Sequence, residues 1–260
     1  MKFKSKHEWY LSSERDFSPE GGDAVSRYLI CSSPRTGSTL LGQMFYDSRV
    51  AGDPLEYLNS AYMAAAYQRF GNFRSVDDYL AALEKYRTSD NGVFGMKIHW
   101  SHFEKIFKDE SSKLSFLNRW DKIFFIRRRN KILQAVSLFR ASRSNVWSSL
   151  DQDFQSGGSL PSGDSFQPVL LSKFLQYVIW QDQSWEARLH QLARPFEVIY
   201  YEDMVKNWTD VSKQALQFVS EFDGQVPSMG LEKQRSEHDE LAMEFTNYLM
   251  GVHDGLICKT

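Results

Sequence analysis

The chain has 260 residues, 42% of them hydrophobic, which is enough for one large α/β domain with a full core. Lysine plus arginine (31) nearly balance aspartate plus glutamate (33), which excludes a global field that would recruit nucleic acid or an anionic membrane surface. Any anion site must therefore be local. Residues 1–18 lack the apolar run of a signal peptide and no later segment approaches membrane-spanning length. We expect a cytoplasmic protein without an integral membrane segment.

Hydrophobic periodicity predicts strands that alternate with helices, the pattern of a parallel sheet covered by helices. The predicted strands span residues 28–32, 93–98, 122–126 and 197–200. The predicted helices span residues 38–46, 76–86, 132–147, 170–192 and 211–221. We expect an α/β fold with a P-loop-like parallel sheet flanked by helices, forming a single domain over residues 28–260 that follows an N-terminal extension, residues 1–27.

The cysteines, the histidines and one glycine- and proline-rich segment indicate which kinds of site to expect. The cysteines Cys31 and Cys258 lie far apart, and Cys31 belongs to a predicted buried strand, so neither a disulfide framework nor a cysteine metal site is expected. The histidines show no ligand spacing either, and we expect no metal. Residues 155–168, rich in glycine and proline, form a candidate lid or acceptor loop.

Residues 31–40 predict a phosphate-sized anion site. A buried strand enters a loop that brings backbone amides, hydroxyls and one guanidinium to the start of a helix. The candidate binding residues are Arg35, Thr36, Gly37, Ser38 and Thr39. The alternative is an ordinary helix cap formed by Ser38 or Thr39.

This loop is similar to a Walker A loop but departs from it at two positions. Ser38 stands where that motif needs lysine, and Ser32 stands where it needs its first glycine. The strand at 122–126 also ends in arginines where a magnesium-binding carboxylate would be needed. These departures favour an enzyme that transfers an anionic group without a metal ion. A P-loop kinase acting on a sugar or nucleoside is the alternative. A non-catalytic nucleotide-binding or carbohydrate-binding module is a third possibility.

A second anion site is predicted at the end of the strand at 122–126. Arg127, Arg128 and Arg129 follow it directly, and Ser137 lies two turns into the next helix. Ligands of open α/β sheets bind at the carboxyl edge of the strands, so both anion sites should share one rim. A nucleotide with charges at its 5′ and 3′ positions fits this spacing. The alternative is a solvated basic turn.

Taken in order, these segments resemble the 3′-phosphoadenosine 5′-phosphosulfate-dependent sulfotransferases, and within them the bacterial trehalose 2-sulfotransferase branch. The resemblance runs from residue 28 to about residue 241. Its carriers are YLICSSPRTGSTLL at 28–41, VAGDPLE at 50–56, NGVFGMK at 91–97, QAVSLFRA at 134–141, YED at 201–203 and KQ at 233–234.

The resemblance implies a sulfotransferase domain that moves a sulfuryl group from this donor to a hydroxyl on a carbohydrate or glycolipid. It assigns residues 35–39 to the 5′-phosphosulfate and Ser137, with one arginine, to the 3′-phosphate. A spacing of nine residues before the serine selects Arg128, our first choice, and a spacing of eight selects Arg129. Lys233 falls in the family's final donor-contacting loop, and a homodimer is implied.

Sulfuryl transfer to an alcohol needs a base for the hydroxyl proton. The resemblance assigns this role to Glu56, in a Pro-bounded turn expected to follow a short strand. His99 is the rival, because a histidine near neutral pKa is a natural base. Lys97 and His99 project from one face of the same predicted strand, and Lys97 is expected to touch the transferred sulfate or the acceptor. Aromatic side chains, among them Trp100, Trp147 and Trp185, are candidates for stacking on a sugar.

Overall fold

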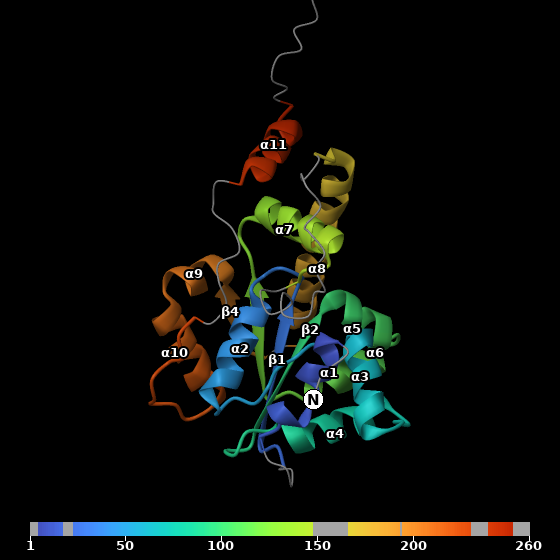
Figure 1. The fold of residues 1–260 in the computed structure, drawn as a ribbon, viewed down its shortest axis with the longest axis vertical. Helices are drawn as coiled ribbons and strands as arrows, with labels where there is room; N and C mark the ends of the chain where they lie inside the picture. Colours follow the sequence, from blue (N-terminus) through green and yellow to red (C-terminus); the bar gives the residue numbers. More distant parts are fainter. Residues whose placement is uncertain (1–4, 18–22, 148–165, 193, 230–238, 252–260) are drawn as a thin grey trace, which may run out of the picture. The chain divides into compact units, whose positions relative to one another are not determined.

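The computed structural model describes residues 5–17, 23–147, 166–192, 194–229 and 239–251. Four strands in these residues form one sheet in the order β2-β1-β3-β4, and all its neighbouring strands are parallel (Figure 1). They are β1 (Ser26–Ser32), β2 (Val93–His99), β3 (Lys122–Arg127) and β4 (Glu197–Tyr200). The predicted α/β fold, a parallel sheet flanked by helices, is confirmed.

The five predicted helices are present with shifted ends, together with helices that periodicity did not reveal. The helix predicted to reach residue 147 ends at Ser144, because Asn145 adopts a left-handed backbone (φ 56°) that stops the helical hydrogen bonds. The helices of the described residues are α1 (Lys6–Tyr10), α2 (Ser38–Ser48), α3 (Ser60–Phe70), α4 (Val76–Arg87), α5 (Trp100–Ile106), α6 (Glu110–Asn118), α7 (Lys131–Ser144), α8 (Pro168–Gln191), α9 (Tyr201–Lys206), α10 (Trp208–Val219) and α11 (Glu240–Leu249).

The chain forms two compact units. The first comprises Met1–Arg129 and Gln181–Gly230 and contains the sheet; the second comprises Asn130–Trp180 and Leu231–Thr260. The second unit contains α7, the first half of α8 and α11, which pack around an apolar cluster. The buried members of this cluster are Val136, Phe139, Leu171, Leu241, Ala242 and Phe245.

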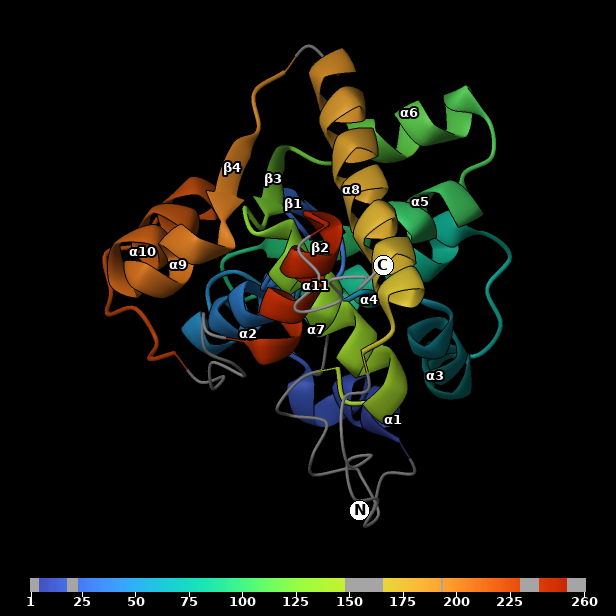
Figure 2. The same cartoon turned by 90° about the horizontal axis from the view of Figure 1, so that it is seen from above.

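Helices cover both faces of the sheet in the first unit. Figure 2 shows α2, α9 and α10 on one face and α5 and α6 on the other. Side chains alternate along a strand, so Tyr28 and Phe124 share the α2 and α10 face. There Tyr28 packs edge-on against Phe45 of α2 at 5.1 Å between ring centroids, and Phe124 packs against Phe218 of α10 at 5.0 Å. Each fully buried ring contributes about 1.5–3 kcal/mol, and together these contacts fix α2 and α10 on this face of the sheet.

The strands end together at one edge of the sheet. Ser32, the last residue of β1, pairs with His99 at the end of β2 and with Ile126 near the end of β3. The loop after β1 and the arginines after β3 therefore leave the sheet side by side, as expected for a ligand-binding edge.

Candidate active site

The loop between β1 and α2 has a constrained backbone. Arg35 (φ 67°) and Gly37 (φ 83°) both occupy the left-handed region. A Cβ on Gly37 would lie 2.6 Å from Cδ2 of Tyr201, so the position accepts only glycine. A non-glycine residue in this region costs on the order of 1–3 kcal/mol, and such strain persists where the surroundings hold the backbone for function. Two left-handed residues therefore fix the turn between β1 and α2.

The predicted anion-binding hydroxyls have different surroundings. Thr36 is fully buried and its Oγ1 donates to the Ser33 carbonyl at 3.0 Å, so it stabilises the loop from within. The N-cap residue of α2 is Gly37, which offers no side chain to the first-turn N–H groups. The alternative that Ser38 or Thr39 caps this helix is therefore wrong. An N-terminus of this kind presents its amides to an anion.

Glu56 lies in a segment without regular structure between α2 and α3. The short strand expected before it does not form, since residues 49–59 contain neither strand nor helix. Instead, the Lys97 N–H donates to the Leu55 carbonyl at 3.0 Å and ties the segment to β2. Gly52 (φ 70°) permits this approach, because a Cβ there would lie 2.8 Å from the Val93 carbonyl oxygen.

Three candidate catalytic residues meet at one oxygen atom. Oε1 of Glu56 lies 3.2 Å from Nζ of Lys97 and 3.2 Å from Nε2 of His99. Both partners point from the same face of β2, as alternation predicted. Their side chains are 5% and 10% exposed and that of Glu56 is 18% exposed, so the three groups interact largely out of water.

Two further contacts orient this cluster. Nζ of Lys97 donates to Oγ1 of Thr39 at 2.9 Å, which joins the cluster to the first turn of α2. Nδ1 of His99 lies 3.1 Å from Oγ and 3.2 Å from the carbonyl oxygen of Ser32. Trp185 donates its indole N–H to that same carbonyl at 3.1 Å. The sequence did not reveal the role of Ser32, because it depends on the register between β1 and β2.

The charges around Glu56 keep it ionised. Burial by itself raises the pKa of a carboxyl group, but the adjacent His99 and Lys97 together hold the pKa of Glu56 well below its usual range. Burial and the neighbouring His99 lower the pKa of His102 to about 4, so His102 is neutral at pH 7. Glu56 is consequently a carboxylate, able to accept a proton, beside one fixed ammonium.

The three arginines at the end of β3, Arg127 to Arg129, have different partners. Arg127 pairs with Asp182 and Glu186. Arg129 is half exposed and binds Asp203 through two hydrogen bonds of 2.6 and 2.7 Å. The guanidinium of Arg128 lies at the loop between β1 and α2, with Nη1 3.5 Å from the Arg35 carbonyl oxygen.

Tyr201 begins the YED segment at 201–203 that carries the resemblance, but the sequence assigned it no role. Its ring packs against Gly37, and the Arg128 guanidinium carbon lies 4.8 Å from the ring centroid. An arginine over an aromatic face is held by a cation–π interaction. Tyr201 thereby fixes Arg128 beside the loop.

The remaining predicted residues fall elsewhere. Ser137 is half-buried on α7 in the second unit, and its assignment stays a prediction. Lys233 and most of the candidate lid at 155–168 lie outside the described residues. Trp100 and Trp185 are 7% and 0% exposed and pack edge-to-face at 5.1 Å, so they belong to the core rather than to a sugar-stacking surface.

Comparison with known proteins shows the family to which the chain belongs. The family model of the Stf0 sulphotransferases matches residues 27–244. The chain belongs to the Stf0 sulphotransferase family. Among its relatives is the trehalose 2-sulfotransferase of Mycobacterium tuberculosis, which is 24% identical over 84% of this chain and 92% of its own.

A solved sulfotransferase structure shares the fold of this chain. The sulfotransferase from Alicyclobacillus acidocaldarius superposes with a TM-score of 0.51 at 13% identity, covering 88% of this chain and 93% of its own, and so shares the fold. The sulfotransferase domain from the curacin biosynthetic pathway has a TM-score of 0.48 at 15% identity over 85% of this chain and 83% of its own.

This Stf0 protein is therefore an enzyme of the sulfotransferase class, which favours that interpretation over the kinase and the non-catalytic module. In the part of the chain that the structure describes, no three His, Cys, Asp or Glu side chains gather as a potential metal site. Nor does any described helix have the length and apolar character needed to cross a bilayer.

Proposed function

We propose that the protein transfers a sulfuryl group from 3′-phosphoadenosine 5′-phosphosulfate to an acceptor hydroxyl, in line, with Glu56 as the general base. The observation that carries this proposal is the position of Glu56 Oε1, 3.2 Å from both Lys97 Nζ and His99 Nε2. Lys97 in turn binds Thr39 in the first turn of α2. The Lys97 side chain thus links the proposed base to the proposed anion site for the donor.

The residues present fit a donor with two anionic ends. Arg35, Ser38, Thr39 and the first amides of α2 would hold the 5′-phosphosulfate, because they offer a cation and hydrogen-bond donors on a fixed loop. Arg128 would hold the 3′-phosphate. It is favoured over Arg129, whose guanidinium is already bound to Asp203. The donor supplies, when bound, a sulfur atom that accepts the new bond and a phosphate that departs with the electrons of the old one.

The side chains around Glu56 suit the removal of a proton from an alcohol. Glu56 is ionised and partly accessible, so it can take the acceptor's hydroxyl proton as that oxygen attacks. His99, held at Nδ1 by Ser32, can donate from Nε2 to Glu56 and orient the carboxylate. Lys97 lies between base and loop, where its charge can stabilise the negative oxygens of the transferred group. His99 remains the alternative base.

The acceptor is proposed from the relatives. A relative that sulfates trehalose favours a carbohydrate or glycolipid hydroxyl here, and Glu56 requires only that the acceptor carry an alcohol. A homodimer and a cytoplasmic location are further parts of the proposal and rest on the family resemblance and on the sequence.

A donor-dependent screen tests the proposed activity. Purified protein is incubated with the phosphosulfate donor and panels of sugars, glycolipids and small alcohols, and the products are analysed by mass spectrometry for the gain of one sulfuryl group. Reactions without donor, and with Glu56→Gln, are the controls. Product from ATP and magnesium, with none from the phosphosulfate donor, would overturn the proposal in favour of a kinase.

A further inference from the structure

The segment before β1 packs against the loop that carries Glu56, although it lies outside the family match, which begins at residue 27. We call residues 5–17 the N-terminal strap. The strap contains α1 and a 3-10 turn, Ser13–Arg15. Two contacts fix its course: the Phe17 N–H donates to the Tyr86 carbonyl at 3.0 Å, and the Arg87 guanidinium donates to the Ser12 carbonyl at 3.1 Å.

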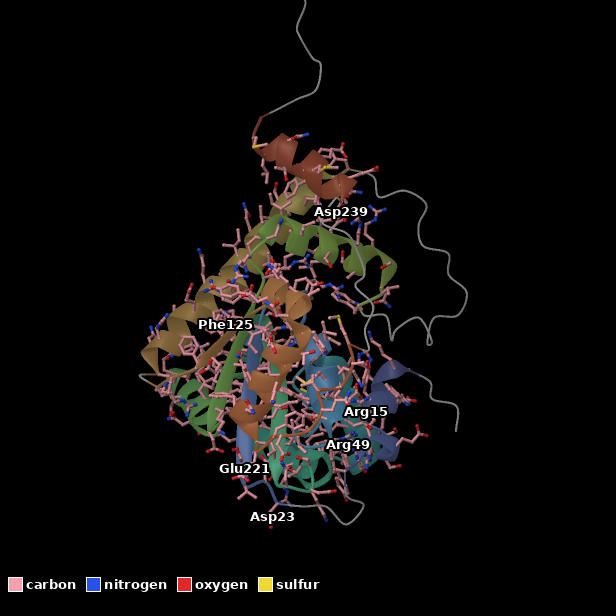
Figure 3. The ribbon with its side chains drawn as sticks, turned by 90° about the vertical axis from the view of Figure 1, so that its left-hand side faces the viewer. Arg15, Asp23, Arg49, Phe125, Glu221 and Asp239 are labelled. Carbon is pink, nitrogen blue, oxygen red and sulfur yellow. The ribbon has the colours of Figure 1, made fainter. Side chains whose placement is uncertain are left out.

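Arg15 of the strap is the partner of a fully buried carboxylate. Its Nε and Nη2 donate to the two oxygens of Asp53 at 2.9 and 2.7 Å, and Arg87 donates to Asp53 at 3.2 Å. Arg15 is 2% exposed, and Asp53 and Arg87 are 0% exposed. Figure 3 shows Arg15 close to Arg49; their guanidinium carbons lie 3.7 and 5.2 Å from the ring centroid of Tyr46.

Asp53 is three residues before Glu56, and its backbone shapes the turn between them. The Asp53 carbonyl accepts from the Leu55 N–H at 3.0 Å and from the Tyr57 hydroxyl. The Leu55 carbonyl accepts from the Lys97 N–H at 3.0 Å. The segment is consequently held at one end by Arg15 and at the other by β2, and Glu56 lies at the β2 end.

We propose that Arg15 is a positioning residue that holds the Asp53 end of this segment and so keeps the Glu56 carboxylate on Lys97 and His99. The proposal rests on the proposed function, because it treats Glu56 as the base. It also makes the N-terminal strap a working part of the active site, beyond what the family match covers.

Stability alone does not explain the buried pair. Removing two charges from water is costly, and apolar residues of similar volume often replace a buried ion pair without loss of stability. The planar guanidinium instead fixes direction, since its two parallel hydrogen bonds allow one orientation of the Asp53 carboxylate. A fixed carboxylate is what a base needs, because a displacement of about 1 Å can lower the rate on the order of 100-fold.

The test is Arg15→Lys, which keeps the charge and loses the paired hydrogen bonds. Arg69→Lys is the matched control, because Arg69 holds the same strap through Asp16 and the Leu11 carbonyl but does not touch Asp53. For Arg15→Lys we expect kcat to fall on the order of 10- to 100-fold, while the dissociation constant for adenosine 3′,5′-bisphosphate stays within about twofold. The acid limb of the kcat/KM profile should move to higher pH, because Glu56 leaves its cationic partners. Arg69→Lys should change neither kcat nor the pH profile.

A readout independent of turnover separates this proposal from the proposed function. Amide hydrogen exchange at Lys97 reports the bond to Leu55, and we expect faster exchange in Arg15→Lys but not in Arg69→Lys. If the wild type sulfates no acceptor while the exchange differs as stated, the proposed function fails and the positioning role stands. If Arg15→Lys exchanges at the wild-type rate, or if both variants lose activity equally, the positioning role is overturned. Should Arg15→Lys not fold, Arg15→Gln, which leaves Asp53 paired with Arg87, is measured against the same criteria.

Discussion

The Lys97 ammonium donates a 2.9 Å hydrogen bond to the Thr39 hydroxyl while its charge lies 3.2 Å from Glu56. One side chain therefore joins the first turn of α2 to the carboxylate proposed as the base. A negative group bound at the loop and the negative charge of Glu56 would share this cation. The site's electrostatics thus depend on a residue of β2 as much as on the loop itself.

The spent donor should bind without metal. Adenosine 3′,5′-bisphosphate is expected to raise the melting temperature equally in EDTA and in magnesium, because the groups proposed to neutralise it are arginines and backbone amides. At a hundredfold excess over its dissociation constant it should add about 2.7 kcal/mol to the free energy of unfolding. Differential scanning calorimetry measures this, and stabilisation that requires magnesium would contradict it.

Arg128→Ala should weaken bisphosphate binding far more than Arg129→Ala. Loss of a charged hydrogen bond costs roughly 1.5–3 kcal/mol, about 10- to 150-fold in the dissociation constant. Arg129 is half exposed and bound to Asp203, so its removal should cost at most about 1 kcal/mol. Isothermal titration calorimetry compares the two variants directly. A larger loss at Arg129 would reverse the assignment.

Glu56→Gln should lower turnover on the order of 100- to 10,000-fold, the usual contribution of general base catalysis. The amide keeps the size of the side chain but cannot take a proton, so the dissociation constant for the bisphosphate should change little. Steady-state kinetics and calorimetry measure the two quantities. His99→Ala is the comparison: near-normal turnover in Glu56→Gln, with none in a folded His99→Ala, would transfer the role of base to His99.

Lys97→Met should move the acid limb of the kcat/KM profile to higher pH. In the folded protein the pKa of Glu56 is depressed below its usual value of about 4.3. The ionised carboxylate therefore stabilises the fold above that pH, and this contribution is lost as the pH falls through the lower, folded-state pKa. Without the Lys97 ammonium the pKa of Glu56 rises, and the ionised carboxylate contributes less to the stability of the fold. Lys105→Met, at an exposed position on α5, is the control and should leave the profile unchanged.

The sheet could be predicted from the sequence because its strands are apolar runs with clear ends. Residues 197–200 were placed without error, and β1, β2 and β3 are one or two residues longer than predicted. The helices missed among the described residues are α1, α3, α5, α6, α9 and α11. α5 and α9 begin directly where β2 and β4 end, without a loop to separate the two patterns. α3 carries alanines and polar residues, so its apolar face is weak.

The sequence predicted individual residues of the site but not how they come together. Lys97 and His99 were expected on one face of a strand, and Glu56 came from the family resemblance. That all three meet at a single oxygen depends on the path of residues 49–59, which no periodicity describes. Arg15 gave no signal at all, since an arginine in a polar N-terminal segment looks solvated until its partner Asp53 is seen to be buried.

The register between β1 and β2 pairs Ile30 with Lys97 and Ser32 with His99, and this register decides where the Lys97 ammonium lies relative to the loop. A Walker A motif carries its lysine within the loop, whereas here the ammonium reaches the loop from the adjacent strand. The register between two strands, rather than the sequence of the loop, positions the lysine here. A one-residue slip of β2 would turn both Lys97 and His99 to the opposite face and leave every letter of the loop unchanged. A single insertion within residues 93–96 would therefore remove the cation from an intact loop.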